Sequence, residues 1–101
     1  SEKFYFEGFL PKKKGKQKRI DYLSKLDSTV VLFESPYRLI KTLENLLVIM
    51  GNRYVSVCKE ISKINEDVFF GKIENVISDL RQKTAIKGEY VILIAREGYD
   101  A

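Results

Sequence analysis

The stretch Thr29–Arg38, with the sequence TVVLFESPYR, decides how the rest of the chain folds. Its four apolar residues, Val30–Phe33, show no polar alternation, and this pattern predicts a strand that is buried on both faces. Ser35 is a favourable helix cap, and Pro36 suits the first position of a helix, where a missing N–H costs nothing. The stretch therefore predicts a buried strand that runs directly into a helix.

Polar side chains follow this strand at once. Glu34, Tyr37 and Arg38 are placed at its carboxyl end, which is where open α/β sheets bind ligands. A second polar cluster, residues 59–63 (KEISK), follows another predicted strand, and parallel strands would bring both clusters to one edge of the sheet. Arg38 suits bidentate contact with a phosphate or carboxylate, and the amides that start the helix add a weak anion site. The plainer interpretation is an ordinary strand–helix junction with one surface ion pair between Glu34 and Arg38.

Hydrophobic periodicity extends the pattern along the chain. Helices are expected over about 17–27, from the Ser-Pro step to the stop signal at Gly51, and over about 73–80. The resulting order, β-α-β-α-β-β-α-β, predicts an α/β domain with a small mixed sheet of about five strands and helices packed on it. The two strands without a helix between them are expected to pair antiparallel. The expected strands lie near residues 4–10, 29–34, 54–59, 66–71 and 90–95.

Composition limits the chemistry. The chain of 101 residues is expected to form a single domain, and it is 45% hydrophobic and 32% charged, as is typical of globular proteins. It contains no histidine and one cysteine, Cys58, so no zinc site, metal centre or Ser–His or Cys–His nucleophile is expected. No apolar run approaches the roughly 20 residues of a membrane span. A protein of the reducing cytoplasm is expected.

The positive charge is concentrated in one short loop. Residues 12–19 (KKKGKQKR) hold six of the 18 basic residues and none of the 14 acidic ones. Such a cluster suits a polyanion such as RNA, which it would bind by neutralising phosphates and releasing counterions. A solvated basic loop without a ligand is the alternative. The candidate RNA-binding residues are Lys12, Lys13, Lys14, Lys16, Lys18 and Arg19.

Five segments, in order and at natural spacings, resemble motifs of one protein family. Residues 4–12 (FYFEGFLPK) resemble F-x-F-x-G-F-L-P-x-K, and residues 33–39 (FESPYRL) resemble F/Y-E-S-P-H-R-L. Residues 59–63 resemble R-E-L-T-K, residues 66–73 resemble E-E-x-x-R-G-x-L, and residues 87–94 (KGEYVILI) resemble K-G-E-x-V-L-V-V. The chain thus resembles the C-terminal domain of bacterial 16S rRNA 2′-O-ribose methyltransferases, in the tetrapyrrole methylase superfamily.

The resemblance implies a two-domain enzyme. Residues 1–101 would be its single C-terminal α/β domain, and the N-terminal domain, which carries most of the S-adenosylmethionine contacts, would be absent from this chain. The whole enzyme would methylate a ribose 2′-hydroxyl of cytidine in the 16S rRNA of the small ribosomal subunit, and members of the family are typically homodimers. Without the other domain, the chain alone is expected to be inactive.

The resemblance also implies site residues, which would form one wall of the interdomain cleft. Tyr37 stands where the family motif has His, so no imidazole chemistry can be assigned there. Lys59 replaces Arg, which loses the planar fork, whereas Ser62 replaces Thr and keeps the hydroxyl. The candidate catalytic residues are Glu34, Glu60 and Lys63. The candidate cleft residues are Glu34, Ser35, Pro36, Arg38, Glu60, Ser62 and Lys63.

Two other functions are compatible with the sequence. The domain could belong to a methylase of corrin or porphyrin precursors, since the same superfamily contains such enzymes. The basic loop would then have no obvious role. It could also be a non-catalytic RNA-binding module whose RNA affinity falls as salt is added.

Overall fold

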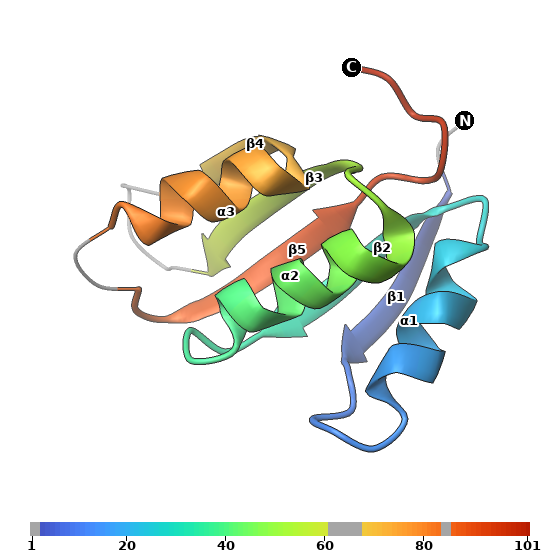
Figure 1. Cartoon of the computed structure of the whole chain (residues 1–101), viewed down its shortest axis with the longest axis horizontal. Coiled ribbons are helices and arrows are strands. Elements are labelled where there is room, and N and C mark those ends of the chain that lie inside the picture. The colour runs from blue at the N-terminus through green and yellow to red at the C-terminus, as the bar shows by residue number, and fades with distance from the viewer. Residues whose placement is uncertain (1–2, 61–67, 84–85) are drawn as a thin grey trace.

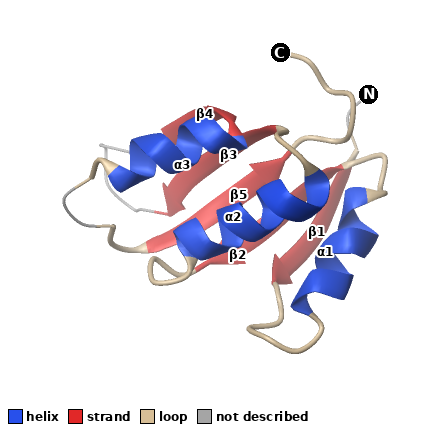
Figure 2. Cartoon of the chain, in the orientation of Figure 1, coloured by secondary structure: helices blue, strands red, loops and turns tan. Residues whose placement is uncertain are grey.

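The computed structural model describes residues 3–60, 68–83 and 86–101, and its elements follow the predicted order (Figure 1). Five strands form one sheet, and the three helices lie over one face of it (Figure 2). Along the chain the elements are β1 (Phe4–Phe9), α1 (Lys16–Ser24), β2 (Thr29–Glu34), α2 (Leu39–Met50), β3 (Tyr54–Glu60), β4 (Val68–Lys72), α3 (Ile73–Arg81) and β5 (Glu89–Ile94).

The sheet is mixed, with the strand order β1-β2-β5-β3-β4. β1 and β2 pair parallel, whereas β5 pairs antiparallel with both β2 and β3. β3 and β4 also pair antiparallel, as expected for two strands without a helix between them. The predicted fold class, an α/β domain with a small mixed sheet, is therefore confirmed. The middle strand is β5, with β2 beside it.

The core lies between the sheet and the helices. Alternate residues of the inner strands face the helices, because successive side chains in a strand point to opposite faces. The helices meet them with residues that recur every three or four positions. The buried core includes Val30 and Leu32 of β2, Val55 and Val57 of β3, Ile92 and Ile94 of β5, Ile20 and Leu23 of α1, Leu39, Leu43 and Leu46 of α2, and Ile73, Val76 and Leu80 of α3.

The other face of the sheet carries no helix in the described part of the chain. Phe4, Phe6 and Phe9 of β1 are 62%, 71% and 60% exposed there. The rings of Phe6 and Phe9 both contact Phe33 of β2 edge to face. The prediction that residues 30–33 are buried on both faces therefore fails at Phe33, which is partly exposed, although Val31 on the same face is buried.

Two helix boundaries differ from those predicted. α1 ends at Ser24, three residues earlier than predicted. α2 begins at Leu39, with Arg38 at the cap position and no side-chain cap, so Ser35 and Pro36 do not start it. Residues 36–38 form a separate turn that precedes the helix. The predicted stop at Gly51 is confirmed, and its φ of +91° is one that glycine adopts readily.

Arg53 connects three elements at one end of the sheet. Its guanidinium group donates to backbone carbonyl oxygens of Ser24 at 2.7 Å, Met50 at 3.2 Å and Ala95 at 3.4 Å. These oxygens lie at the end of α1, at the end of α2 and just after β5. Burial lowers the pKa of Arg53. Arg53 therefore satisfies carbonyl groups that the ends of the elements leave without partners.

Replacing Arg53 by Met should lower the free energy of unfolding by about 2–3 kcal/mol, because partly buried carbonyl groups lose a charged donor. Urea denaturation of the chain measures this change. Arg81→Met is the matched control, since Arg81 pairs with Glu44 on the surface and both side chains are largely exposed. Its loss should cost only about 0–1 kcal/mol. Equal losses in the two variants would contradict the role given to Arg53.

Candidate cleft wall at the ends of β2 and β3

The two strands that lead into the predicted polar clusters end at one edge of the sheet. Because β2 and β3 both run antiparallel to β5, they point in the same direction. Glu34 and Lys59 lie on either side of Tyr90 in the sheet register. The expected convergence of the two strand ends is thus confirmed. The backbone of Glu60 pairs with Glu89. Ser62 and Lys63 lie outside the described residues.

Glu34 is buried at this edge, and its carboxylate accepts hydrogen bonds from three groups. The Thr42 hydroxyl donates to Oε2 at 2.6 Å, and the Ser35 amide donates to Oε1 at 2.8 Å. Nε of Arg38 donates to the same Oε1 at 3.2 Å. Glu34 and Arg38 do form the expected ion pair, but only 5% of the Glu34 side chain is exposed, so the pair is not a simple surface pair. A carboxylate held in this way is suited to position its neighbours.

Lys16 extends the Glu34 network inward from the basic loop. Its Nζ donates to Oγ1 of Thr42 at 3.0 Å, so the Thr42 hydroxyl accepts from Lys16 and donates to Glu34. Burial lowers the pKa of Lys16, and the Glu34 carboxylate opposes this shift. Lys16 was expected on the RNA-binding surface with its neighbours. It instead packs inward against α2, because Thr42 offers its ammonium group a partner.

The turn after Glu34 carries one buried and one partly exposed hydrogen-bond donor. The Ser35 carbonyl oxygen accepts from the Arg38 amide at 3.2 Å, which closes the turn that contains Pro36. The Ser35 hydroxyl oxygen is buried and has no partner among the described residues. The Arg38 side chain is 37% exposed, and its terminal Nη atoms have no hydrogen-bond partner among the described residues. Tyr37 is 94% exposed and contributes nothing to the Glu34 network.

Gly88 makes room for Lys59 at the same edge. Its φ is +82°, and a Cβ added there would lie 2.8 Å from Cε of Lys59. The aliphatic part of the Lys59 side chain therefore crosses the backbone of Gly88 just before β5 begins. This contact gives a physical reason for the glycine in the segment of residues 87–94.

Arg19 is also bound within the domain. Its Nε and Nη2 each donate to Glu7 at 2.7 Å, and Nη2 donates to the Tyr5 hydroxyl at 3.0 Å. The hydrogen bonds to Glu7 raise the pKa of Arg19. Its guanidinium group also lies over the Tyr22 ring. Four of the six basic residues proposed to bind RNA remain exposed, namely Lys12, Lys13, Lys14 and Lys18.

The sequence did not reveal Thr42, Glu7 or Tyr5 as members of these networks. Thr42 carries the one available signal, because it lies between Leu39 and Leu46 on the apolar stripe of α2. A polar residue on such a stripe must find a buried partner. Glu7 and Tyr5 gave no comparable signal, because β1 is an edge strand.

The fold is one seen in methyltransferases. A solved cobalt precorrin-4 methyltransferase, described as a cobalamin biosynthetic enzyme, superimposes with a TM-score of 0.64 over 91% of this chain and 39% of its own. The sequences are only 16% identical, so this likeness concerns the fold alone. No protein-family model matches the chain. No described helix is long and apolar enough to cross a membrane.

Similarity in sequence relates the chain to a narrower group of proteins than similarity in fold does. Three proteins named ribosomal RNA small subunit methyltransferase I are similar to nearly the whole chain. The protein from Halalkalibacterium halodurans is 37% identical over 97% of this chain, that from Thermotoga maritima 38% over 94%, and that from Bacillus subtilis 35% over 90%. The chain is therefore homologous to ribosomal RNA small subunit methyltransferase I. It spans 34%, 43% and 31% of the length of these three relatives, respectively.

The buried position of Lys16 predicts a pH effect on stability. Its pKa is lowered from 10.5 in the folded chain, so between the lowered value and 10.5 the unfolded chain binds more protons than the folded one. The wild-type chain should therefore gain stability relative to Lys16→Met as the pH rises toward 10.5. The gain should be at most about 1.4 kcal/mol per pH unit.

Urea denaturation of both proteins at pH 7, 9 and 10.5 measures this difference. Lys18→Met is the matched control, because Lys18 is an exposed lysine of the same helix and should show no such trend. If the stability of wild type relative to Lys16→Met stays constant or falls as the pH rises, the lowered pKa of the buried Lys16 is contradicted.

Proposed function

We propose that this chain is the C-terminal domain of an S-adenosylmethionine-dependent methyltransferase that methylates a ribose 2′-hydroxyl of cytidine in 16S rRNA. The observation that carries this proposal is the 37% identity over 97% of the chain to a protein named ribosomal RNA small subunit methyltransferase I. The small ribosomal subunit would be its substrate in the cytoplasm. Because the chain spans about a third to two fifths of its relatives, a second domain would complete the enzyme.

The edge that holds Glu34 suits one wall of a cleft between two domains. The Arg38 side chain is 37% exposed and could donate to a ligand or to a second domain, and the buried Ser35 hydroxyl beside it has no partner among the described residues. S-adenosylmethionine, when bound, supplies an electrophilic methyl group. The chain lacks a Gly-rich phosphate loop, so the N-terminal domain would supply most of the contacts to this cofactor.

The network supports a positioning role for Glu34. Its carboxylate already accepts hydrogen bonds from Thr42, Ser35 and Arg38, so it holds the Arg38 guanidinium in a fixed place. Alignment of the reacting groups supplies much of the rate in such transfers. Glu60 and Lys63 remain candidates for the base that accepts the hydroxyl proton. The cleft residues Pro36, Ser62 and Lys63 keep their proposed place on this wall.

The alternative functions have weaker support. A methylase of corrin or porphyrin precursors shares the fold, but the identity to the solved precorrin enzyme is only 16%. A freestanding RNA-binding module would explain the exposed lysines but not the buried network at the end of β2.

The longer protein that carries this chain should transfer labelled methyl groups from S-adenosylmethionine to small ribosomal subunits, and the 101-residue chain alone should not. In the longer protein, Arg38→Gln should lower the transfer at least tenfold, because the cleft loses an aligned charged donor. Arg81→Gln, on the exposed face of α3, is the matched control. Methylation by the chain alone, or transfer to precorrin substrates instead of RNA, would overturn the proposal.

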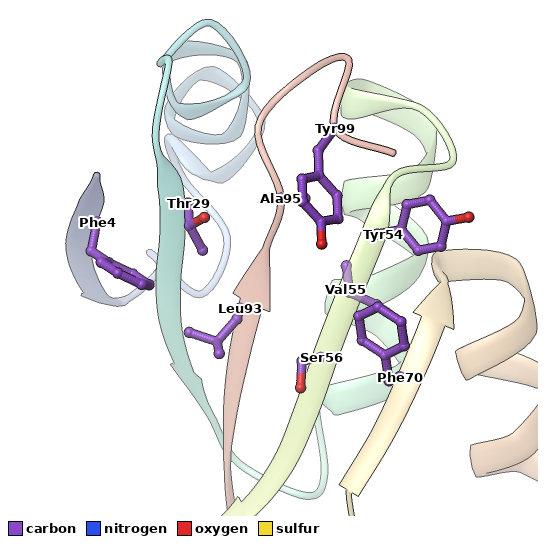
Figure 3. Close-up of a pocket in the computed structure, with 9 residues that line it drawn as sticks. All are labelled: Phe4, Thr29, Tyr54, Val55, Ser56, Phe70, Leu93, Ala95 and Tyr99. Atoms are coloured by element: carbon purple, nitrogen blue, oxygen red, sulfur yellow. The ribbon is translucent and has the colours of Figure 1, made fainter. Parts of the chain in front are cut away.

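We also propose that the open face of the sheet joins two copies of the chain. Phe4, Phe6, Phe9 and Phe70 are 59–71% exposed there, and clustered exposed apolar side chains are typical of interaction surfaces. Beside Phe4 lies a hollow of about 250 Å³, and none of the described residues that line it is charged (Figure 3). Tyr54 stacks on Phe70 at its rim. A two-fold axis would place this face of one copy against the same face of the other.

Sedimentation of the chain should show a dimer that Phe6→Asp converts to a monomer, because a buried carboxylate in the interface has no partner. Val48→Asp is the matched control, since Val48 is 83% exposed on α2, which covers the opposite face. A chain that is monomeric at every concentration would refute the dimer, as would equal dimerisation of the two variants.

A further inference from the structure

A second site lies apart from the Glu34 edge, where the basic loop meets α2. A hollow of about 590 Å³ opens there, within the size range of about 300–1,000 Å³ that is usual for ligand sites. The loop and the start of α1 supply one side, and α2 supplies the other. The side chains that characterise the hollow are Lys12, Lys13, Lys16, Lys18, Lys41 and Asn45.

α2 contributes two of these side chains from one face. Lys41 and Asn45 are four residues apart, so they lie next to each other along the helix. In the sequence, both were simply polar positions off the apolar stripe of α2. The packing of α1 against α2 brings them opposite the lysine loop. Lys41 is exposed, so its ammonium group is free to contact a ligand.

The charge of the hollow has one sign. Of the described residues that line it, five are lysines, and none is acidic or aromatic. Lys41 and Arg38 are close enough to Lys16 to contribute to the lowering of its pKa, after burial as the main cause. The first amides of α1, which begins directly after Gly15, add partial positive charge beside the lysines.

We propose that this hollow binds the phosphodiester backbone of single-stranded RNA, with Lys41 and Lys18 as contacts on opposite sides. The proposal rests on the proposed function only in taking RNA as the ligand. With no aromatic side chain for base stacking, the hollow reads phosphates and not bases. Lys16 forms its floor, and the hydrogen bonds from Lys16 through Thr42 to Glu34 hold the hollow at a fixed position relative to the cleft wall.

Lys41 is the residue that tests this proposal, because it lies outside the basic loop. Fluorescence anisotropy of the chain with labelled 12-nucleotide oligo(U) and oligo(A) measures the binding. One lost phosphate contact weakens binding to a single strand by about eightfold at 50 mM salt and about threefold at 200 mM. Lys41→Gln should therefore show these losses equally with both oligonucleotides, and the salt slope should fall by about 0.7.

Lys25→Gln is the matched control, since it removes the same charge from the far end of α1, where Lys25 is 75% exposed beside Asp21. Its affinity should change less than twofold. Equal effects of the two substitutions would overturn the proposal that the hollow binds RNA. The absence of RNA binding at 50 mM salt would also overturn it. Methyl transfer by the longer protein is measured separately. If transfer fails while RNA binding still depends on Lys41, the proposed methyltransferase function is refuted and the proposed RNA binding in the hollow is supported.

Discussion

The buried carboxylate of Glu34 is the constraint on which the functional edge depends. A charge that loses water at the end of β2 must be compensated, and Thr42, Ser35 and Arg38 together provide that compensation. Because the Thr42 hydroxyl also accepts a hydrogen bond from Lys16, the same carboxylate fixes the beginning of α1 against α2. One acidic group therefore sets the position of the turn at the proposed cleft wall and of the basic loop proposed to bind RNA.

The two faces of the sheet have different chemistry for the same reason that strands alternate. One set of side chains meets the helices and forms the core, and the other set includes the exposed phenylalanines of β1. The Glu34 network lies where β2 ends, outside these two apolar faces. The proposed cleft wall and the lysine hollow lie on the helix side of the molecule, and the proposed dimer surface lies on the other.

Periodicity predicted the strands and helices because burial imposes it directly on the sequence. The same logic predicted that Glu34 and Lys59 would end at one edge, since parallel strands share a direction. Sequence could not show that Lys16 turns inward, because nothing distinguishes it from Lys14 or Lys18 within the lysine run. It also misplaced the start of α2, where the turn held by Ser35 and Arg38 delays the helix to Leu39. Such contacts depend on partners far away in the chain.

The strand order has a consequence for how the domain forms during protein synthesis. β5 lies between β2 and β3, although the ribosome makes it after all the other strands. Until residues 89–94 have emerged, β1 with β2 and β3 with β4 can form only as two separate pairs whose inner edges are unpaired. Exposed strand edges of this kind invite pairing with other chains. Insertion of β5 is thus the step that joins the two halves, and it brings Glu34 and Lys59 together on either side of Tyr90.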